Sequence, residues 1–152
     1  MSADTRPLVF ITGASSGIGQ ALAERFARAG WRLALVARRS EELQVWAGAQ
    51  GWDAQRCRVY RADVADADSI VQAGRLCLST QGVPEVVVAN AGVSIGMDTE
   101  VRGDLDVMAR TFATNNTGLA ATFHPFVEAM QARGRGRPVG IASVAAIRGL
   151  PG

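Results

Sequence analysis

The sequence predicts an α/β fold in which helices cover both faces of a doubly wound parallel sheet. Short apolar runs alternate with amphipathic stretches along the chain, the order expected of parallel strands joined by right-handed helical crossovers. The run Pro84–Ala89 is continuous in valine, as in a strand buried on both faces. A glycine-rich turn separates the first apolar run from the first amphipathic stretch.

The first strand and helix follow from their periodicity. Leu8–Ile11 is a short apolar run, and the stretch after the glycine-rich turn repeats apolar residues every four positions, at Ile18, Leu22 and Phe26. This spacing places them on one helical face, and Gly30 suits the end of that helix.

The later elements continue the same alternation. Ser40 is suited to cap the second helix, and the acidic residues after it favour a first turn. We expect a strand at Arg32–Ala37, a helix from Ser40 to near Gly51, a strand at Cys57–Ala62, a helix from Asp66 or Asp68 through Leu78, a strand at Pro84–Ala89, a helical region from about Asp104 to Ala132 as one helix or two, and a fifth strand at Val139–Ala142.

Composition excludes several classes of protein. The chain has 152 residues, 48% of them hydrophobic and 20% charged, which suits one globular domain. Its formal net charge of +2 gives no reason to expect nucleic acid or a membrane surface as a partner. There is no apolar run of about eighteen residues and no apolar signal segment near the N-terminus. Cys57 and Cys77 lack metal-binding or redox spacing, so we expect a cytoplasmic protein without a metal.

The glycine-rich turn has the features of a phosphate-binding loop. Gly13 permits a tight turn out of the strand, Gly17 lets a phosphate approach the backbone, and Gly19 lets the helix pack close to the sheet. The helix N-terminus then offers free N–H groups to a pyrophosphate, and serine hydroxyls add further donors. The predicted contacts are Gly13, Ser15, Ser16, Gly17, Ile18 and Gly19.

The turn reads TGASSGIG, and at this point the sequence resembles the short-chain dehydrogenase/reductase family, whose glycine spacing is G-x-x-x-G-x-G. Further motifs follow in the family's order. They resemble its adenine-contacting aspartate motif at Asp63-Val64, the tail of its N-N-A-G motif at Asn90-Ala91-Gly92, its N-x-x-G motif at Asn115–Gly118, and the strand that ends in its active-site serine at Ile141-Ala142-Ser143. The resemblance implies a Rossmann-like fold and a nicotinamide cofactor.

The end of the second predicted strand favours NADP(H) over NAD(H). A dinucleotide enzyme that prefers NAD usually has a carboxylate there to accept from the ribose hydroxyls. Ala37 occupies that position, and Arg38 and Arg39 follow it. A guanidinium binds a 2′-phosphate as a fork. Arg38 is our first choice for that contact, with Arg39 assisting or stacking.

The family's chemistry is hydride transfer between nicotinamide and an alcohol or carbonyl. The resemblance gives Ser143 the role of orienting the carbonyl oxygen and Asn115 that of holding a relay water through its backbone, in a locally irregular helix. The family's tyrosine and lysine have no counterpart, because the sequence contains no lysine and its one tyrosine, Tyr60, lies on the third predicted strand. We therefore predict that these 152 residues alone are inactive.

We expect residues 1–152 to be a single Rossmann-type dinucleotide-binding domain that lacks its C-terminal part. The alternation stops just after the fifth strand, which would leave an apolar edge uncovered. Three interpretations stay open. In the first, the chain is part of an NADP-dependent oxidoreductase that acts on a small alcohol or carbonyl compound. In the second, it is a non-catalytic dinucleotide sensor or scaffold. In the third, it is a gene fragment without function. The resemblance also implies a homo-oligomer, a dimer or tetramer.

Overall fold

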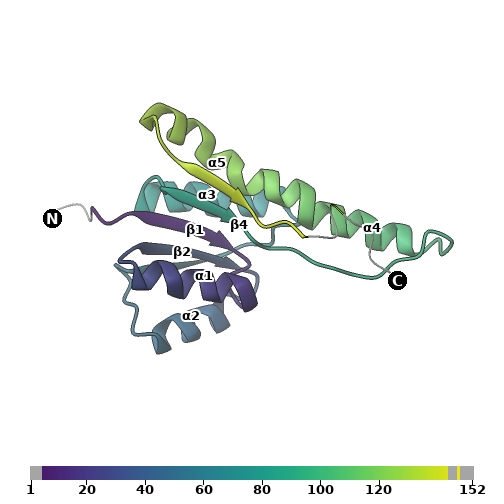
Figure 1. Cartoon of the computed structure of the whole chain (residues 1–152), viewed down its shortest axis with the longest axis horizontal. Helices are drawn as coiled ribbons and strands as arrows, with labels where there is room; N and C mark the ends of the chain where they lie inside the picture. Colours follow the sequence, from purple (N-terminus) through teal and green to yellow (C-terminus); the bar gives the residue numbers. More distant parts are fainter. Residues whose placement is uncertain (1–4, 144–146, 148–152) are drawn as a thin grey trace.

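The structure of the chain is a computed structural model that describes residues 5–143 and 147. Its strands and helices alternate in the predicted order (Figure 1). They are β1 (Leu8–Thr12), α1 (Gly17–Arg28), β2 (Arg32–Ala37), α2 (Ser40–Ala49), β3 (Cys57–Arg61), α3 (Ala67–Gln81), β4 (Val86–Ala89), α4 (Asp104–Phe112), the π-helical turn η1 (Ala113–Thr117), α5 (Gly118–Arg133) and β5 (Arg137–Gly140).

The strands form one parallel sheet in the order β3-β2-β1-β4-β5. α1 and α2 lie on one face of this sheet, whereas α3 and α5 lie on the other (Figure 1). The chain therefore winds outward from β1 in both directions, which confirms the predicted doubly wound, Rossmann-like α/β fold. A sheet of this kind leaves a crevice at the carboxyl ends of β1 and β4, where the strand order reverses.

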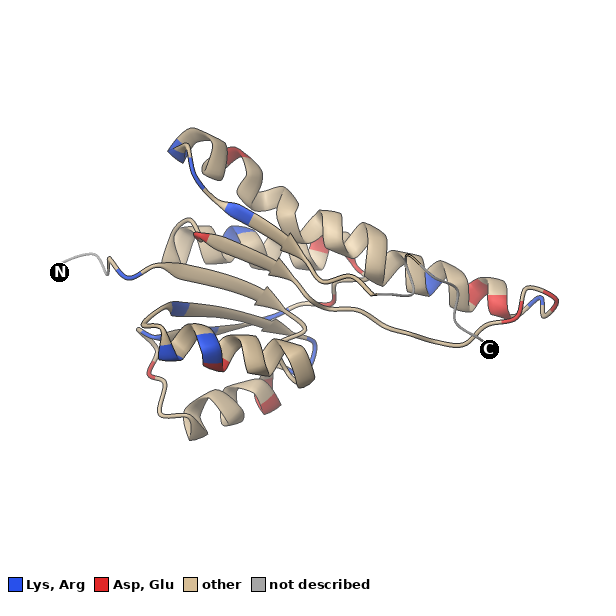
Figure 2. Cartoon of the chain, in the orientation of Figure 1, with Lys and Arg blue, Asp and Glu red and all other residues tan. Residues whose placement is uncertain are grey.

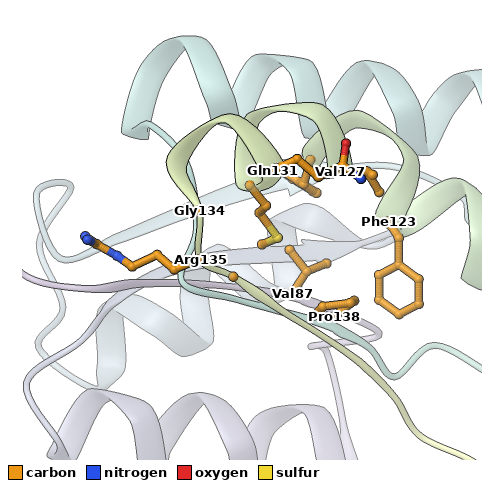
Figure 3. A pocket seen from close by; sticks show the side chains of 10 residues that line it. Val87, Phe123, Val127, Gln131, Gly134, Arg135 and Pro138 are labelled. Atoms are coloured by element: carbon orange, nitrogen blue, oxygen red, sulfur yellow. The ribbon is translucent and has the colours of Figure 1, made fainter.

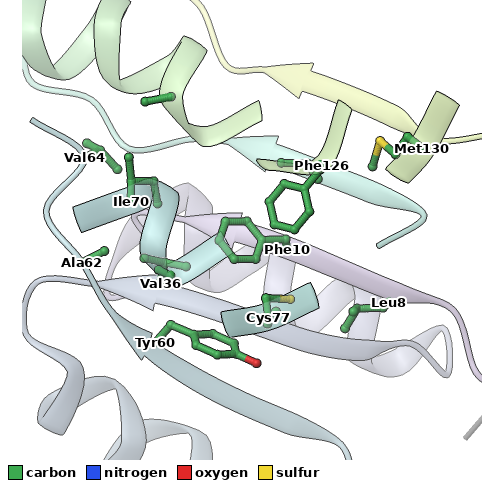
Figure 4. Packing of buried hydrophobic residues seen from close by; sticks show 14 residues of the cluster. Leu8, Phe10, Val36, Tyr60, Ala62, Val64, Ile70, Cys77, Phe126 and Met130 are labelled. Atoms are coloured by element: carbon green, nitrogen blue, oxygen red, sulfur yellow. The ribbon is translucent and has the colours of Figure 1, made fainter. Parts of the chain in front are cut away.

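Alternate side chains of β1 enter two separate cores. Leu8 and Phe10 pack with residues of α3 and α5, and Val9 and Ile11 pack with residues of α1 and α2; all four are buried. The ring of Phe10 lies 4.8 Å from that of Phe126, measured between centroids (Figure 4). Because both faces are covered, the central strands read as continuous apolar runs rather than as alternating ones.

The long helical region is one continuous rod with a change of winding in its middle. The π-helical turn η1 joins α4 directly to α5, so the helix continues through this point with a local change in its hydrogen-bond pattern. α4 reaches beyond the sheet (Figure 1), and none of its residues is buried. Its first turn carries Asp104 and Asp106, and Figure 2 shows acidic residues at this end of α4. A carboxylate at a helix N-terminus is stabilised by the helix dipole.

The predicted bounds of the fifth strand are wrong. We expected Val139–Ala142, but β5 spans Arg137–Gly140 and pairs with β4. The N–H of Arg137 donates to the backbone oxygen of Glu85 at 2.9 Å. The Arg133 guanidinium also donates to backbone oxygens of the loop before β4. These contacts hold the chain beside β4 earlier than its apolar pattern indicates.

Candidate functional site

A cavity of about 340 Å³ lies where the strand order reverses. It is lined by the ends of β1 to β4, by the glycine-rich turn and by one residue of η1. Every predicted cofactor residue except Gly19 lines it. The complete lining is Gly13, Ser15, Ser16, Gly17, Ile18, Val36, Ala37, Arg38, Arg39, Ala62, Asp63, Val64, Asn90, Ala91, Gly92, Val93 and Thr114.

The glycine-rich turn passes very close to the end of β4. Gly13 has a φ of +64°, which favours glycine, and a Cβ there would lie 2.8 Å from the Cα of Ala91. Gly19 is buried in α1, and a Cβ there would collide with the backbone of the same turn. Gly13 and Gly19 therefore allow the turn, the helix and β4 to meet, which is why Gly19 supports the cavity without lining it.

The turn leaves hydrogen-bond donors at the cavity. Ser16 is the N-cap residue of α1, with an extended backbone and no hydrogen bond from its side chain to the helix. Ser15 and Ser16 both line the cavity, which opens at the N-terminus of α1. Free N–H groups and the positive end of the helix dipole favour an anion at such a position.

A polar network ties the end of β1 to the segment after β4. The buried Thr12 hydroxyl accepts from the backbone N–H of Asn90 at 3.1 Å and from that of Ala91 at 3.2 Å. The side-chain amide of Asn90 donates in return to the backbone oxygens of Thr12 and Gly13, at 3.1 and 3.2 Å. Asn90 therefore supports the turn as well as lining the cavity.

Asn115 lies in η1, which agrees with the locally irregular helix expected around it. Its Oδ1 accepts from the N–H of Val93 at 2.9 Å, and its Nδ2 donates to the oxygen of Val93 at 2.8 Å. Val93 and Thr114 line the cavity, whereas Asn115 does not. The side chain of Asn115 thus bonds to a residue of the cavity wall.

Charged groups meet where the cavity is bounded by the ends of β2 and β3. Arg38 and Arg39 follow β2 and are exposed, and the Arg38 Nη1 lies 4.0 Å from the Asp63 Oδ2. The Arg39 Nε lies 3.0 Å from the Oε2 of Glu42. Ala37 ends β2, so no carboxylate occupies the place where one would accept from a ribose. This end of the cavity carries two guanidinium groups and suits an anion.

Ser143 is described and exposed, but it is not among the residues that line the cavity. The N–H of Ile141 donates to the backbone oxygen of Ala89 at 3.0 Å, so the segment after β5 still runs beside β4. Ser143 therefore follows β5 at the same carboxyl edge of the sheet as the cavity.

Tyr60 lies on β3, outside the cavity, and its hydroxyl bonds to Thr80 and Gln81 at 2.8 Å each. Burial raises the pKa of the Tyr60 phenol to about 12. A buried, hydrogen-bonded phenol with this pKa is poorly suited to exchange protons near neutral pH. Tyr60 thus packs in the core. The single histidine, His124, is exposed on α5 and does not line the cavity either.

A second cavity, of about 320 Å³, lies between α5 and β5 (Figure 3). It contains none of the predicted site residues and is lined mainly by apolar side chains, among them Val87, Phe123 and Met130. Within the described ranges no helix is long and apolar enough to cross a membrane, and His, Cys, Asp and Glu nowhere cluster as a metal site would require.

Sequence reasoning missed several residues of the first cavity. The Thr12 hydroxyl supports the cavity by bonding to the segment after β4. Thr12 could have been predicted, because it is the first residue of the TGASSGIG motif. Thr114 directly precedes Asn115 and could have been found as its neighbour. The other missed lining residues are Val36, Ala62 and Val93, whereas Ala37 was predicted as the place without a carboxylate.

Comparisons with known proteins agree with this geometry. A family model described as short chain dehydrogenase matches residues 7–152. An uncharacterized oxidoreductase of Myxococcus xanthus is 36% identical over 142 residues, covering 93% of this chain and 56% of that protein. Short-chain dehydrogenase reductase 5 of Arabidopsis thaliana is 34% identical over 146 residues, covering 95% and 56%.

Solved structures are similar in the same way. An alcohol dehydrogenase from Thermococcus sibiricus, complexed with 5-hydroxy-NADP, superposes with a TM-score of 0.84 at 30% identity and covers 96% of this chain and 62% of its own. A metagenomic short-chain oxidoreductase in complex with NADP gives 0.83 at 28% identity, covering 95% and 65%. The chain spans between about two-fifths and three-fifths of the length of the curated relatives that it matches.

Proposed function

Since this chain belongs to the short-chain dehydrogenase family of oxidoreductases, we propose that it binds NADP(H) and forms the cofactor-binding part of an enzyme acting on an alcohol or carbonyl compound. One observation carries the proposal above all. The glycine-rich turn, both arginines, Asp63 and the segment after β4 line a single cavity at the reversal of the strand order. That is where a doubly wound sheet binds its ligands.

The residues of the cavity match the parts of a dinucleotide. The turn and the N-terminus of α1 would hold the pyrophosphate, with Ser15 and Ser16 as added donors. Asp63 and Val64 would contact the adenine, and the segment Asn90–Gly92 would follow the cofactor toward the nicotinamide. Each of these groups already faces the cavity. When bound, the cofactor supplies or accepts a hydride.

The preference for NADP(H) is proposed from charge. Arg38 and Arg39 line the cavity beyond Ala37. A guanidinium attracts a 2′-phosphate, whereas a carboxylate at the same place would repel it. NAD(H) is the alternative cofactor. Two of the solved relatives are described as complexes with NADP or a hydroxylated form of it, which supports the proposal by similarity.

For the reaction, we propose that Ser143 orients the carbonyl oxygen and that Asn115 holds a relay water through its backbone. Two observations favour the role of Asn115. The π-helical winding of η1 departs from the regular helical hydrogen-bond pattern, and both polar atoms of the side chain already bond to Val93. The 152 residues contain no lysine, and Tyr60 is buried elsewhere, so we expect no turnover from them alone. A cytoplasmic location stays a prediction from the sequence, and a homo-oligomer stays an expectation from the family resemblance.

A non-catalytic dinucleotide sensor is the second candidate, because the chain carries the cofactor cavity without a tyrosine and lysine pair. Titration with NADPH and NADH, followed by nicotinamide fluorescence, tests the part that both candidates share. We expect saturable binding, tighter for NADPH. No binding of either dinucleotide would contradict the proposal. Turnover assays on the longer polypeptide, if one exists, then separate the enzyme from the sensor.

A further inference from the structure

We propose that Glu42 is a specificity-determining residue that limits the preference for NADP(H), because its carboxylate competes with the cofactor's 2′-phosphate for Arg39. The inference rests on the proposed function, namely the binding of a dinucleotide in the cavity beside β2. The new element is Glu42, a residue that opposes binding of the 2′-phosphate in this cavity.

The two arginines of the cavity have unequal carboxylate partners. Arg39 is close to its partner, since its Nε lies 3.0 Å from the Glu42 Oε2. Arg38 is 4.0 Å from the Asp63 Oδ2, and the other oxygen of Asp63 accepts from a backbone N–H at 3.0 Å. Arg39 therefore has the closer carboxylate of the two, although both arginines line the cavity.

Glu42 lies beside the Arg39 guanidinium, where its charge opposes an incoming anion. It lies in the first turn of α2, three residues after Arg39, which is the N-cap position of that helix. A carboxylate in the first turn interacts favourably with the helix dipole. The Glu42 carboxylate lies on the Nε side of the Arg39 guanidinium, so a phosphate that binds this guanidinium shares it with a second negative charge.

Glu42 has two opposing effects on the affinity for NADP(H): it orients Arg39 and it repels the 2′-phosphate. Their relative sizes decide whether Glu42 strengthens or weakens binding. The ion pair orients Arg39, but the side chains of both residues are about two-thirds exposed (67% and 66%), and such pairs hold a side chain only weakly. A phosphate monoester carries nearly two negative charges at neutral pH, so its repulsion by Glu42 is the larger effect. The 2′-hydroxyl of NAD(H) carries no charge and meets no such repulsion.

The test uses Glu42→Gln with Glu41→Gln as the matched control. Glu41 is an exposed acidic residue in the same helical turn, so its substitution removes the same charge without touching the pair with Arg39. We expect Glu42→Gln to tighten NADPH binding about threefold to tenfold and to leave NADH binding within about twofold. The gain should exceed that of Glu41→Gln and shrink at high salt, where exposed charges are screened.

Titration with 2′,5′-ADP and 5′-AMP isolates the phosphate, because these fragments differ only in that group, and only the first should gain. If Glu42→Gln matches Glu41→Gln, or weakens NADPH binding, the inference about Glu42 is overturned while NADPH binding by the wild type still supports the proposed function. If the wild type binds neither dinucleotide, the proposed function fails and the inference fails with it.

Discussion

Both polar atoms of the Asn115 side chain bind the backbone of one residue, Val93. Oδ1 accepts from its N–H at 2.9 Å, and Nδ2 donates to its oxygen at 2.8 Å. This pair joins the π-helical turn η1 to the segment that leaves β4, and Val93 lines the cavity. A single amide therefore fixes the position of one cavity wall relative to the long helix.

Substituting Asn115 by leucine should lower the free energy of unfolding by about 1–3 kcal/mol, because the change leaves the N–H and the oxygen of Val93 without these partners in a half-buried place. Denaturant unfolding measures the loss. Asn116→Leu is the control, since Asn116 is exposed in the same turn. Equal stability of the two variants would contradict the structural role of Asn115.

Thr12→Val tests the network between β1 and β4. Valine keeps the shape of threonine but removes the hydroxyl that accepts from the N–H groups of Asn90 and Ala91. We expect a loss of about 1–3 kcal/mol in the free energy of unfolding. Thr122→Val is the matched control, because Thr122 is equally buried but its hydroxyl only donates to the oxygen of Gly118 within α5. A loss no larger than in this control would mean that the Thr12 hydroxyl does not brace the site.

Gly17→Ala separates cofactor binding from backbone strain. Gly17 and Gly51 both have positive φ values, +53° and +74°, and a Cβ at either would meet open space. Alanine should therefore cost a similar amount of stability at both, about 1–2 kcal/mol. Only Gly17 faces the cavity, so only Gly17→Ala should weaken NADPH binding, by tenfold or more, on the order of 1.4 kcal/mol. Equal NADPH affinity of the two variants would argue against a phosphate at this turn.

Stability should fall in alkaline solution. Burial raises the pKa of Cys57, Cys77 and Tyr60 to about 12, whereas the ordinary values are 9.0 for the thiols and 10.0 for the phenol. From about pH 9 upward the unfolded chain therefore binds fewer protons than the folded chain, and the free energy of unfolding decreases as pH rises toward 12. Denaturant unfolding at a series of pH values measures this slope. Cys77→Ala should flatten it, and a free energy that stays constant above pH 9 would refute this prediction.

The sequence was sufficient for the fold wherever burial alone determines the pattern. β1 and β4 are covered on both faces, so their apolar runs predict them directly. Of the two expected starts of the third helix, Asp66 is the one that caps α3, since its side chain accepts from the N–H groups of Asp68 and Ser69. β5 was misplaced because backbone bonds to Glu85 and the Arg133 guanidinium, not apolar residues, bring it beside β4.

The sequence predicted those residues of the site that belong to recognisable motifs. The turn, the arginines and the segment after β4 converge as expected because their positions follow from strand ends in a parallel sheet. Arg39 and Glu42 are three residues apart at the start of α2, a spacing from which their ion pair could have been predicted. The pairing of Asn115 with Val93 depends on side-chain placement across elements, which no spacing in the sequence specifies. The part played by Thr114 depends in the same way on the winding of η1.

The most direct test of the central claim is to map where NADPH binds, by following the backbone amide chemical shifts of the 152-residue chain during a titration. We predict that the shifts concentrate at Gly13–Gly19, Arg38, Arg39, Asp63 and Asn90–Gly92 and leave the apolar cavity between α5 and β5 unchanged. The absence of shifts, or shifts centred on Phe123 and Met130, would contradict the assignment of the cofactor to the carboxyl edge of the sheet.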